Sequence, residues 1–233
     1  MNNLVKQADL LPHNGTQIYT EGLKMHRKFL ITIFAFLVIN GAVKAIEFTE
    51  DDYYIEIEGK ATKHKEITEY FSFFCPHCFK QEALMDELIA SLPAGATFKK
   101  NHVDSMPGQN IKIEQALTKA LVTAEILKVK EKMIPAIFKY IHIDKAKFDN
   151  ETDIRNLFLI NGVDGNKFDK TFASFTVNAQ SKKMQKRTKE LRLQGITSVP
   201  TLIINGKYKP LTDNIRSMDE YKKLILFLLN KKA

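Results

Sequence analysis

The chain has 233 residues, of which 44% are hydrophobic and 27% are charged, with ten glycines, seven prolines and two cysteines. This composition excludes a collagen-like, low-complexity or largely disordered chain, and two cysteines exclude a scaffold built on several disulfides. The formal net charge is +8. The length predicts one domain, or one domain with an insertion, with enough residues for a hydrophobic core.

The first 45 residues predict an export signal. A basic segment (residues 26–28) precedes eleven uncharged residues (29–39), and small residues follow up to Ala45. This order is typical of a secretory signal peptide, whereas a membrane-spanning helix needs about 20 apolar residues. We expect cleavage after Ala45, with translation starting at Met1 or Met25. Removing residues 1–45 removes five Lys or Arg and two Asp or Glu, which lowers the net charge to +5.

The first elements predicted after the export signal lie on either side of the two cysteines. Residues 65–74 are aromatic and β-branched and predict a strand that runs directly into Cys75. Pro76 is tolerated in a first helical turn, and apolar residues then recur at helical spacing until Pro93. Residues 96–103 predict a second strand.

A helical block follows and ends in a hairpin. Helices separated by breakers such as Pro135 and Asn161-Gly162 are expected at residues 111–129, 131–142, 151–161, 165–175 and 177–193. Residues 196–204 predict a strand, Asn205-Gly206 a hairpin turn, and residues 217–229 an amphipathic closing helix. The pattern predicts an α/β domain, formed by residues 46–104 and 188–233, with a helical insertion at residues 105–187.

The two cysteines lie within four residues, in Cys75-Pro76-His77-Cys78. A disulfide across so short a loop constrains little of the unfolded chain, so it stabilises the fold poorly. In an exported protein such a pair can persist as a disulfide. Redox chemistry is therefore the better explanation for this pair.

The predicted position of Cys75 at a helix start favours its thiolate form. Unpaired backbone N–H groups and the positive end of the helix dipole stabilise a negative sulfur there, and His77 can add a donor or a positive charge. Stabilising the thiolate stabilises the reduced protein and makes the disulfide a stronger oxidant. Cys78, one turn further into the helix, suits a resolving role.

Two segments resemble the DsbA family of periplasmic thiol oxidases. They are Glu-Tyr-Phe-Ser-Phe-Phe-Cys-Pro-His-Cys at residues 69–78 and Gly-Ile-Thr-Ser-Val-Pro-Thr-Leu-Ile-Ile-Asn-Gly-Lys at residues 195–207. The C-P-H-C motif, about 120 residues before a V-P-T strand start, is far more specific than a bare C-x-x-C. The resemblance covers residues 46–233 and implies a thioredoxin-like fold with an inserted helical domain.

The resemblance also implies roles for single residues. Cys75 corresponds to the attacking cysteine, with Pro76 and His77 between it and its partner Cys78. Val199 and a cis Pro200 correspond to the loop that faces the cysteines and binds substrate.

Three charged residues match family positions that tune the redox pair. Glu69 and Lys100 match a charged pair under the disulfide, and Glu82 matches another acid. Solvated charges at strand ends are the alternative reading for Glu69 and Lys100. A buried carboxylate in the apolar run 67–74 needs a partner, which Lys100 could supply.

Other polar and aromatic residues have simpler readings. His102 matches a family strand position but could equally be an ordinary strand side chain, and His64 and His142 are expected at the surface. The cations at residues 182–189 are expected on a solvated helix face rather than at a nucleic-acid site. The aromatics at positions 71, 73, 74 and 79 are expected in the core and the groove lining, and no metal site is expected.

The resemblance implies a periplasmic protein dithiol oxidase. It would donate the Cys75–Cys78 disulfide to reduced exported polypeptides through a mixed disulfide, and the quinone-linked membrane protein DsbB would reoxidise it. No cofactor besides this disulfide and no nucleic acid is implied, and the family default is a monomer. Alternatives are a reductase or isomerase of the same fold, a soft-metal carrier or a peptide-binding chaperone. The link after Tyr208 is shorter than in the best-known member, which leaves substrate preference open.

Overall fold

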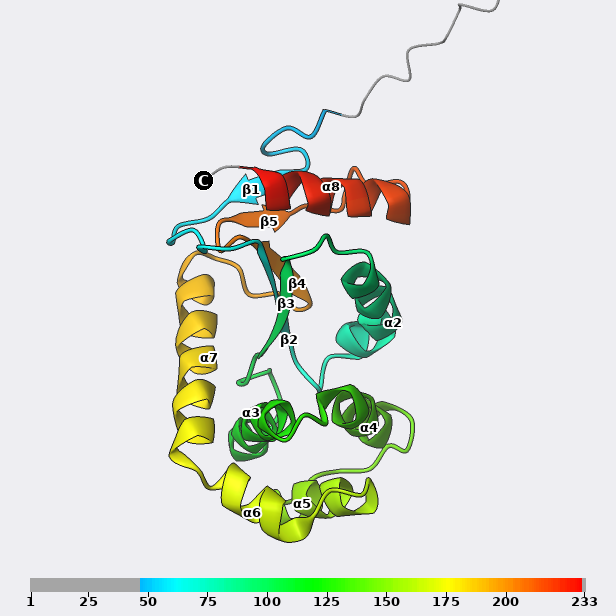
Figure 1. Ribbon diagram of the computed structural model, residues 1–233, viewed down its shortest axis with the longest axis vertical. Coiled ribbons are helices and arrows are strands. Elements are labelled where there is room, and N and C mark those ends of the chain that lie inside the picture. Colours follow the sequence, from blue (N-terminus) through cyan, green and yellow to red (C-terminus); the bar gives the residue numbers. More distant parts are fainter. Residues whose placement is uncertain (1–46, 232–233) are drawn as a thin grey trace, which may run out of the picture. The chain divides into compact units, whose positions relative to one another are not determined.

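The structure, a computed structural model, describes residues 47–231, and the predicted export signal lies outside them. The described residues from Phe48 onward belong to one compact unit, in which five strands and seven helices are described (Figure 1). Among these described helices, none is both long and apolar enough to cross a bilayer.

A five-stranded mixed sheet forms the centre of this unit, in the order β1-β5-β4-β2-β3. β2 and β3 are parallel, and the other neighbouring pairs are antiparallel. Because parallel strands need a crossover connection, helix α2 (Pro76–Ala90) joins β2 to β3. The strands are β1 (Tyr54–Glu56), β2 (Glu66–Phe71), β3 (Thr97–His102), β4 (Thr201–Ile204) and β5 (Tyr208–Pro210).

Five helices follow one another between β3 and β4, so a helical insertion interrupts the sheet in the chain (Figure 1). Side chains of Asn110, Asn150, Asp164 and Ser174 accept hydrogen bonds from backbone N–H groups at the starts of four of them, which satisfies donors that a helix start leaves unpaired. The inserted helices are α3 (Ile111–Ile126), α4 (Lys130–His142), α5 (Glu151–Ile160), α6 (Gly165–Phe172) and α7 (Phe175–Leu193), and α8 (Met218–Asn230) closes the chain.

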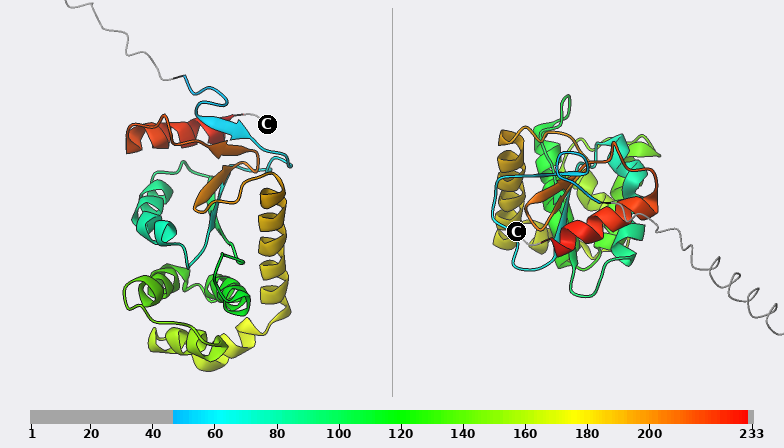
Figure 2. Two further views of the ribbon diagram at one scale, coloured as in Figure 1. Left: turned by 180° about the vertical axis from the view of Figure 1, so that it is seen from behind. Right: turned by 90° about the horizontal axis from the view of Figure 1, so that it is seen from above.

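Helices cover both faces of the sheet, because successive side chains of a strand point to opposite faces. Ile67 of β2 packs on one face with Leu88 of α2 and Leu224 of α8. Tyr70 of β2 packs on the other face with Leu191 of α7. The helix α7 therefore lies across the sheet from α2, as both side views show (Figures 1 and 2).

The core of the helical insertion continues into the segment that carries the cysteines. Phe71 and Phe73 are fully buried, with ring centroids 5.1 Å apart, and Phe138 of α4 lies 5.1 Å from Phe73. Burying one side chain of this size contributes about 1.5–3 kcal/mol. Cys75 and Cys78 belong to the same apolar cluster, so the inserted helices pack directly against the redox pair.

Most expected elements lie within a few residues of the observed ones, and the hairpin is confirmed. Asn205 and Gly206 have φ of 52° and 68°, and β4 and β5 pair antiparallel across them. Two-residue hairpin turns require this left-handed backbone. A side chain on Gly206 would also place its Cβ 2.9 Å from the Lys60 carbonyl oxygen.

Two expectations about these elements are wrong, and one strand was missed. The strand expected at residues 196–204 begins only at Thr201, because the preceding residues form a loop. Pro135 does not separate helices but lies inside α4. Its exposed position lets water reach the Glu131 carbonyl that loses its hydrogen-bond donor. The edge strand β1 was not predicted at all.

Candidate active site

Cys75 is the N-cap residue of α2. Its backbone is extended, with φ −84° and ψ 114°, and its Sγ accepts a hydrogen bond from the Cys78 backbone N–H at 3.2 Å. Pro76 occupies the first turn, where the N–H that proline lacks would have no helical partner. The Cys75 sulfur thus takes the place of a capping oxygen, at the end of the helix where negative charge is stabilised.

Both cysteines are buried, and Cys75 keeps only a small exposed fraction. Both are free thiols in this structure, with 5% of Cys75 and none of Cys78 exposed. Burial raises the pKa of the Cys78 thiol, and its hydrogen bond with Cys75 raises it further. Reduced Cys78 therefore stays protonated at neutral pH.

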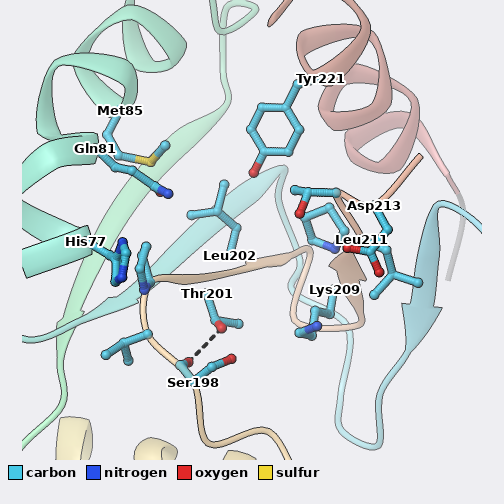
Figure 3. A pocket seen from close by; sticks show the side chains of 14 residues that line it. His77, Gln81, Met85, Ser198, Thr201, Leu202, Lys209, Leu211, Asp213 and Tyr221 are labelled. Carbon is cyan, nitrogen blue, oxygen red and sulfur yellow. Dashed lines mark hydrogen bonds between the residues drawn. The ribbon is translucent and has the colours of Figure 1, made fainter. Parts of the chain in front are cut away.

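A loop from the second half of the chain lies against Cys75. The Val199–Pro200 peptide bond is cis, and the Cys75 thiol donates to the Val199 carbonyl oxygen, with 3.5 Å between sulfur and oxygen. The Thr201 hydroxyl donates to the Ser198 carbonyl at 2.8 Å and closes the loop (Figure 3). Segments about 120 residues apart therefore meet at one sulfur.

A cavity of about 490 Å³ opens beside this loop (Figure 3). His77 and Met85 of α2, Leu202 of β4 and Tyr221 of α8 line it, and residues 209–213 form another edge. His77 is exposed to solvent. Burial raises the pKa of the Tyr221 phenol, so the hydroxyl that points into the cavity in Figure 3 is neutral. The volume lies within the range of ligand pockets, and the lining mixes polar and charged side chains with apolar ones.

Glu69 of β2, Lys100 of β3 and Glu82 of α2 form an ion-pair cluster. The Lys100 ammonium is 2.6 Å from Glu69 Oε2 and 2.7 Å from Glu82 Oε1, and it also lies 4.8 Å from the centre of the Phe71 ring. The Glu69 side chain is fully buried, while 11% of Lys100 and 18% of Glu82 are exposed. Solvated strand-end charges are therefore the wrong reading for Glu69 and Lys100.

Burial dominates the titration of this cluster. It raises the pKa of the Glu69 carboxyl above its ordinary 4.5, against the opposing pull of Lys100, and it does the same for Glu82. Burial alone would lower the pKa of Lys100, but the charges of Glu69 and Glu82 outweigh it, so that pKa is raised. The charge of Glu69 also acts on Cys78, whose pKa it helps to raise. The cluster and the redox pair are therefore electrostatically connected.

His102 is a core histidine that supports the cysteine segment. Its Nε2 accepts a hydrogen bond from the Phe73 backbone N–H at 3.2 Å, and its Nδ1 lies 2.8 Å from the Thr118 hydroxyl. Because that hydroxyl already donates to the Glu114 carbonyl, Nδ1 carries the proton. Complete burial lowers the pKa of His102 to about 3, so the ring is neutral.

The expectation of a surface position is wrong for His142. Its ring stacks on Phe79 at 5.1 Å with a 6° interplanar angle, and its Nε2 lies 2.8 Å from the Phe73 carbonyl oxygen. His142 therefore joins the end of α4 to the residues on both sides of the C-P-H-C motif. His64, in contrast, is exposed as expected.

The comparisons with known proteins decide the family. A family model described as a DSBA-like thioredoxin domain matches residues 66–225. The chain belongs to the DsbA family. Its fold is accordingly thioredoxin-like with a helical insertion, and as a member of this family it is a thiol:disulfide interchange oxidoreductase.

Individual relatives agree over most of the chain. The thiol:disulfide interchange protein DsbA of Pectobacterium carotovorum subsp. carotovorum is 32% identical over 207 residues, which cover 84% of this chain and 95% of the relative. The protein of the same name from Yersinia pestis is 31% identical over 205 residues, with the same shares. A structure of a Proteus mirabilis DsbA variant with a peptide superposes with a TM-score of 0.70 at 26% identity, covering 80% of this chain and 100% of that one.

The structure brings together the candidate residues for this DsbA-type chemistry. Cys75, Pro76, His77 and Cys78 form the start of α2, and the Val199–Pro200 loop contacts the first of them. Sequence reasoning missed the cavity side chains of α2 and α8 and the role of His142 in packing. No motif marks these residues, because only the fold brings their helices to the loop.

Proposed function

We propose that this protein is an exported protein dithiol oxidase, which donates the Cys75–Cys78 disulfide to newly exported polypeptides. The observation that carries the proposal is the Cys75 sulfur itself. It caps α2, contacts the Val199 carbonyl of a cis-proline loop, and is paired with a fully buried partner thiol. A helix start stabilises sulfur as an anion and so favours the reduced form of the pair.

The reaction begins with the disulfide form. A substrate thiolate attacks the Cys75 sulfur, the bond to Cys78 breaks, and Cys78 leaves with the electron pair. The pKa of Cys78 is raised, so this leaving thiolate takes up a proton. A second substrate thiolate then attacks the substrate sulfur of the mixed disulfide and releases Cys75 as a thiolate that the Cys78 N–H holds. Two substrate thiols become one disulfide, and the protein's disulfide becomes two thiols.

The substrate chain binds along the Val199–Pro200 loop and the adjoining cavity. An extended chain can pair its backbone with Val199, because proline at the next position leaves that carbonyl outside a regular strand ladder. The Proteus mirabilis relative is described with a non-covalently bound peptide, PWATCDS. By analogy, residues next to the substrate cysteine occupy the cavity of about 490 Å³, where His77 lies at the rim.

The remaining parts of the proposed cycle are the tuning of the redox pair and its reoxidation. Glu69, Lys100 and Glu82 tune the redox pair through the charge of Glu69 on Cys78. A DsbB-type, quinone-linked membrane protein reoxidises the thiols, so the disulfide itself is the only redox group needed. The protein acts in the periplasm, as a monomer, after cleavage behind Ala45. Its inserted helical domain comprises residues 105–187.

The test uses a peptide with two thiols and the wild-type, Cys75→Ser and Cys78→Ser proteins. We expect the wild-type disulfide to oxidise the peptide and Cys75→Ser to be inactive. Cys78→Ser is first activated as a mixed disulfide between Cys75 and a small thiol. It should pass this one disulfide to the peptide and then stop, because it cannot form the Cys75–Cys78 disulfide. A peptide-binding chaperone would keep its activity in Cys75→Ser. A glutathione equilibrium that showed a strongly reducing couple would favour the reductase reading and refute the oxidase.

A further inference from the structure

The outer surface of α7 carries an arrangement of side chains that the thiol chemistry does not use. Five residues of α7 lie within about 40° of one line along the helix, at 3.6 residues per turn. They are here named the α7 stripe and are Phe175, Lys182, Lys186, Lys189 and Leu193. All five are exposed, with 86% of Phe175 and 78% of Leu193 open to solvent. The stripe is about 27 Å long.

The α7 stripe is strongly positive and is not part of the core. The exposed Lys183 and Arg187 flank it. Within the described part of the chain, the one ion pair recorded for its lysines joins Lys186 to Glu190, at 3.7 Å. The opposite side of α7 supplies the buried contacts, among them Val177 and Met184. The exposed cations and apolar ends are therefore free to contact something outside the unit.

We propose that the α7 stripe binds the surface of an anionic phospholipid bilayer. Lysines on a helix that lies along such a surface meet lipid phosphates, and apolar side chains enter the boundary between headgroups and acyl chains. An apolar residue at each end of a row of lysines fits this plane. Binding of single-stranded nucleic acid uses aromatic rings between the cations for base stacking, and Phe175 is the only aromatic residue of the stripe.

The position of α7 keeps this surface apart from the redox site. It packs on the face of the sheet opposite to α2 and α8, and side chains of α2 and α8 line the cavity beside Cys75. In Figures 1 and 2, α7 forms one side of the folded unit. A bilayer on the α7 stripe therefore leaves the cavity open, and the inference does not depend on the proposed oxidase activity.

The test measures partition of the protein into sedimented vesicles of neutral phosphatidylcholine, with or without 25 mol% of anionic phosphatidylglycerol. The stripe variant is Lys182→Gln, Lys186→Gln, Lys189→Gln. The control variant, Lys63→Gln, Lys112→Gln, Lys223→Gln, removes the same charge from exposed positions elsewhere. Both keep the same N-terminus as the wild type, so any contribution of residues 1–46 cancels. Circular dichroism and peptide oxidation report on folding and on the thiol chemistry.

We expect the wild type to bind the anionic vesicles. It should bind the neutral vesicles far more weakly. Each lysine near an anionic surface contributes about fivefold to binding, so the stripe variant should bind about 100-fold more weakly than the wild type. Phe175→Ser with Leu193→Ser should weaken binding at high salt, where the apolar contribution remains. Equal losses in the stripe and control variants, absence of anionic binding at low salt, or displacement by millimolar glycerol phosphate would each overturn the proposal.

Discussion

Replacing Lys100 by methionine tests the ion-pair cluster. The substitution keeps an apolar side chain of similar length but removes the charge 2.6 Å from Glu69, whose side chain is fully buried. A buried charge that loses its partner typically destabilises a protein by 3–5 kcal/mol. Glu69 can avoid part of this cost by taking up a proton, because burial already raises its pKa.

Protonation sets a limit on the loss and gives it a pH dependence. In the unfolded chain Glu69 ionises near 4.5, so holding it neutral at pH 7 costs about 1.36 kcal/mol for each of the intervening pH units, or about 3.4 kcal/mol. A carboxyl whose pKa is raised by folding destabilises the fold as pH rises from its unfolded pKa towards its folded pKa. Lys100→Met should therefore lose no more than about 3 kcal/mol at pH 7, relative to the wild type, and much less at pH 5.

Urea unfolding of the reduced protein at pH 5, 6 and 7 measures this difference. The matched control is the double variant Glu69→Gln, Lys100→Met, which buries a neutral amide in place of the carboxyl. It should regain most of the stability lost at pH 7, and its stability should fall much less between pH 5 and pH 7 than that of Lys100→Met. A loss in Lys100→Met that is the same at all three pH values, or that the second substitution fails to relieve, would refute the reasoning.

Two further predictions concern the histidines around Phe73. The pKa of His102 is lowered to about 3, so below its ordinary 6.5 the unfolded chain binds a proton that the folded protein excludes. Wild-type stability should then fall, relative to His102→Gln, by about 1.4 kcal/mol per pH unit from pH 6.5 towards pH 4; parallel urea-unfolding profiles would contradict this. His142→Ala, which loses a hydrogen bond to Phe73 and the stacking on Phe79, should lower the free energy of unfolding by about 1–2 kcal/mol. The exposed His64→Ala should change it by less than about 0.5 kcal/mol, and equal effects of the two would contradict the packing role of His142.

Local patterns were sufficient to predict much of the fold. The aromatic and β-branched run at residues 65–74 predicted β2, which the structure limits to Glu66–Phe71, and every residue of this strand except Glu66 is buried. The Asn205-Gly206 pair marks a hairpin through backbone conformation alone. The pairing of Glu69 with Lys100 was implied by the resemblance to the family, and the cost of burying a carboxylate in an apolar strand supported it.

The errors arise where contacts distant in the chain decide the structure. The strand β1 has three residues and pairs with β5 alone, so no periodicity marks it. The strand expected from residue 196 begins at Thr201 because the preceding loop lies against Cys75. His142 gave no signal in the sequence, since its partners Phe73 and Phe79 lie more than 60 residues earlier.

The order of the strands in the sheet has a consequence for the way an exported chain would fold. β2, which leads into the cysteines, is paired with β3 on one side and with β4 on the other, but β4 begins 135 residues after β2 does. A chain that crosses a membrane N-terminus first presents its two thiols while one edge of β2 is still open. Joining strands so far apart closes a large loop late in folding and slows it. During that interval the nascent protein is itself an unfolded polypeptide with reduced cysteines, chemically similar to the molecules on which its mature form would act.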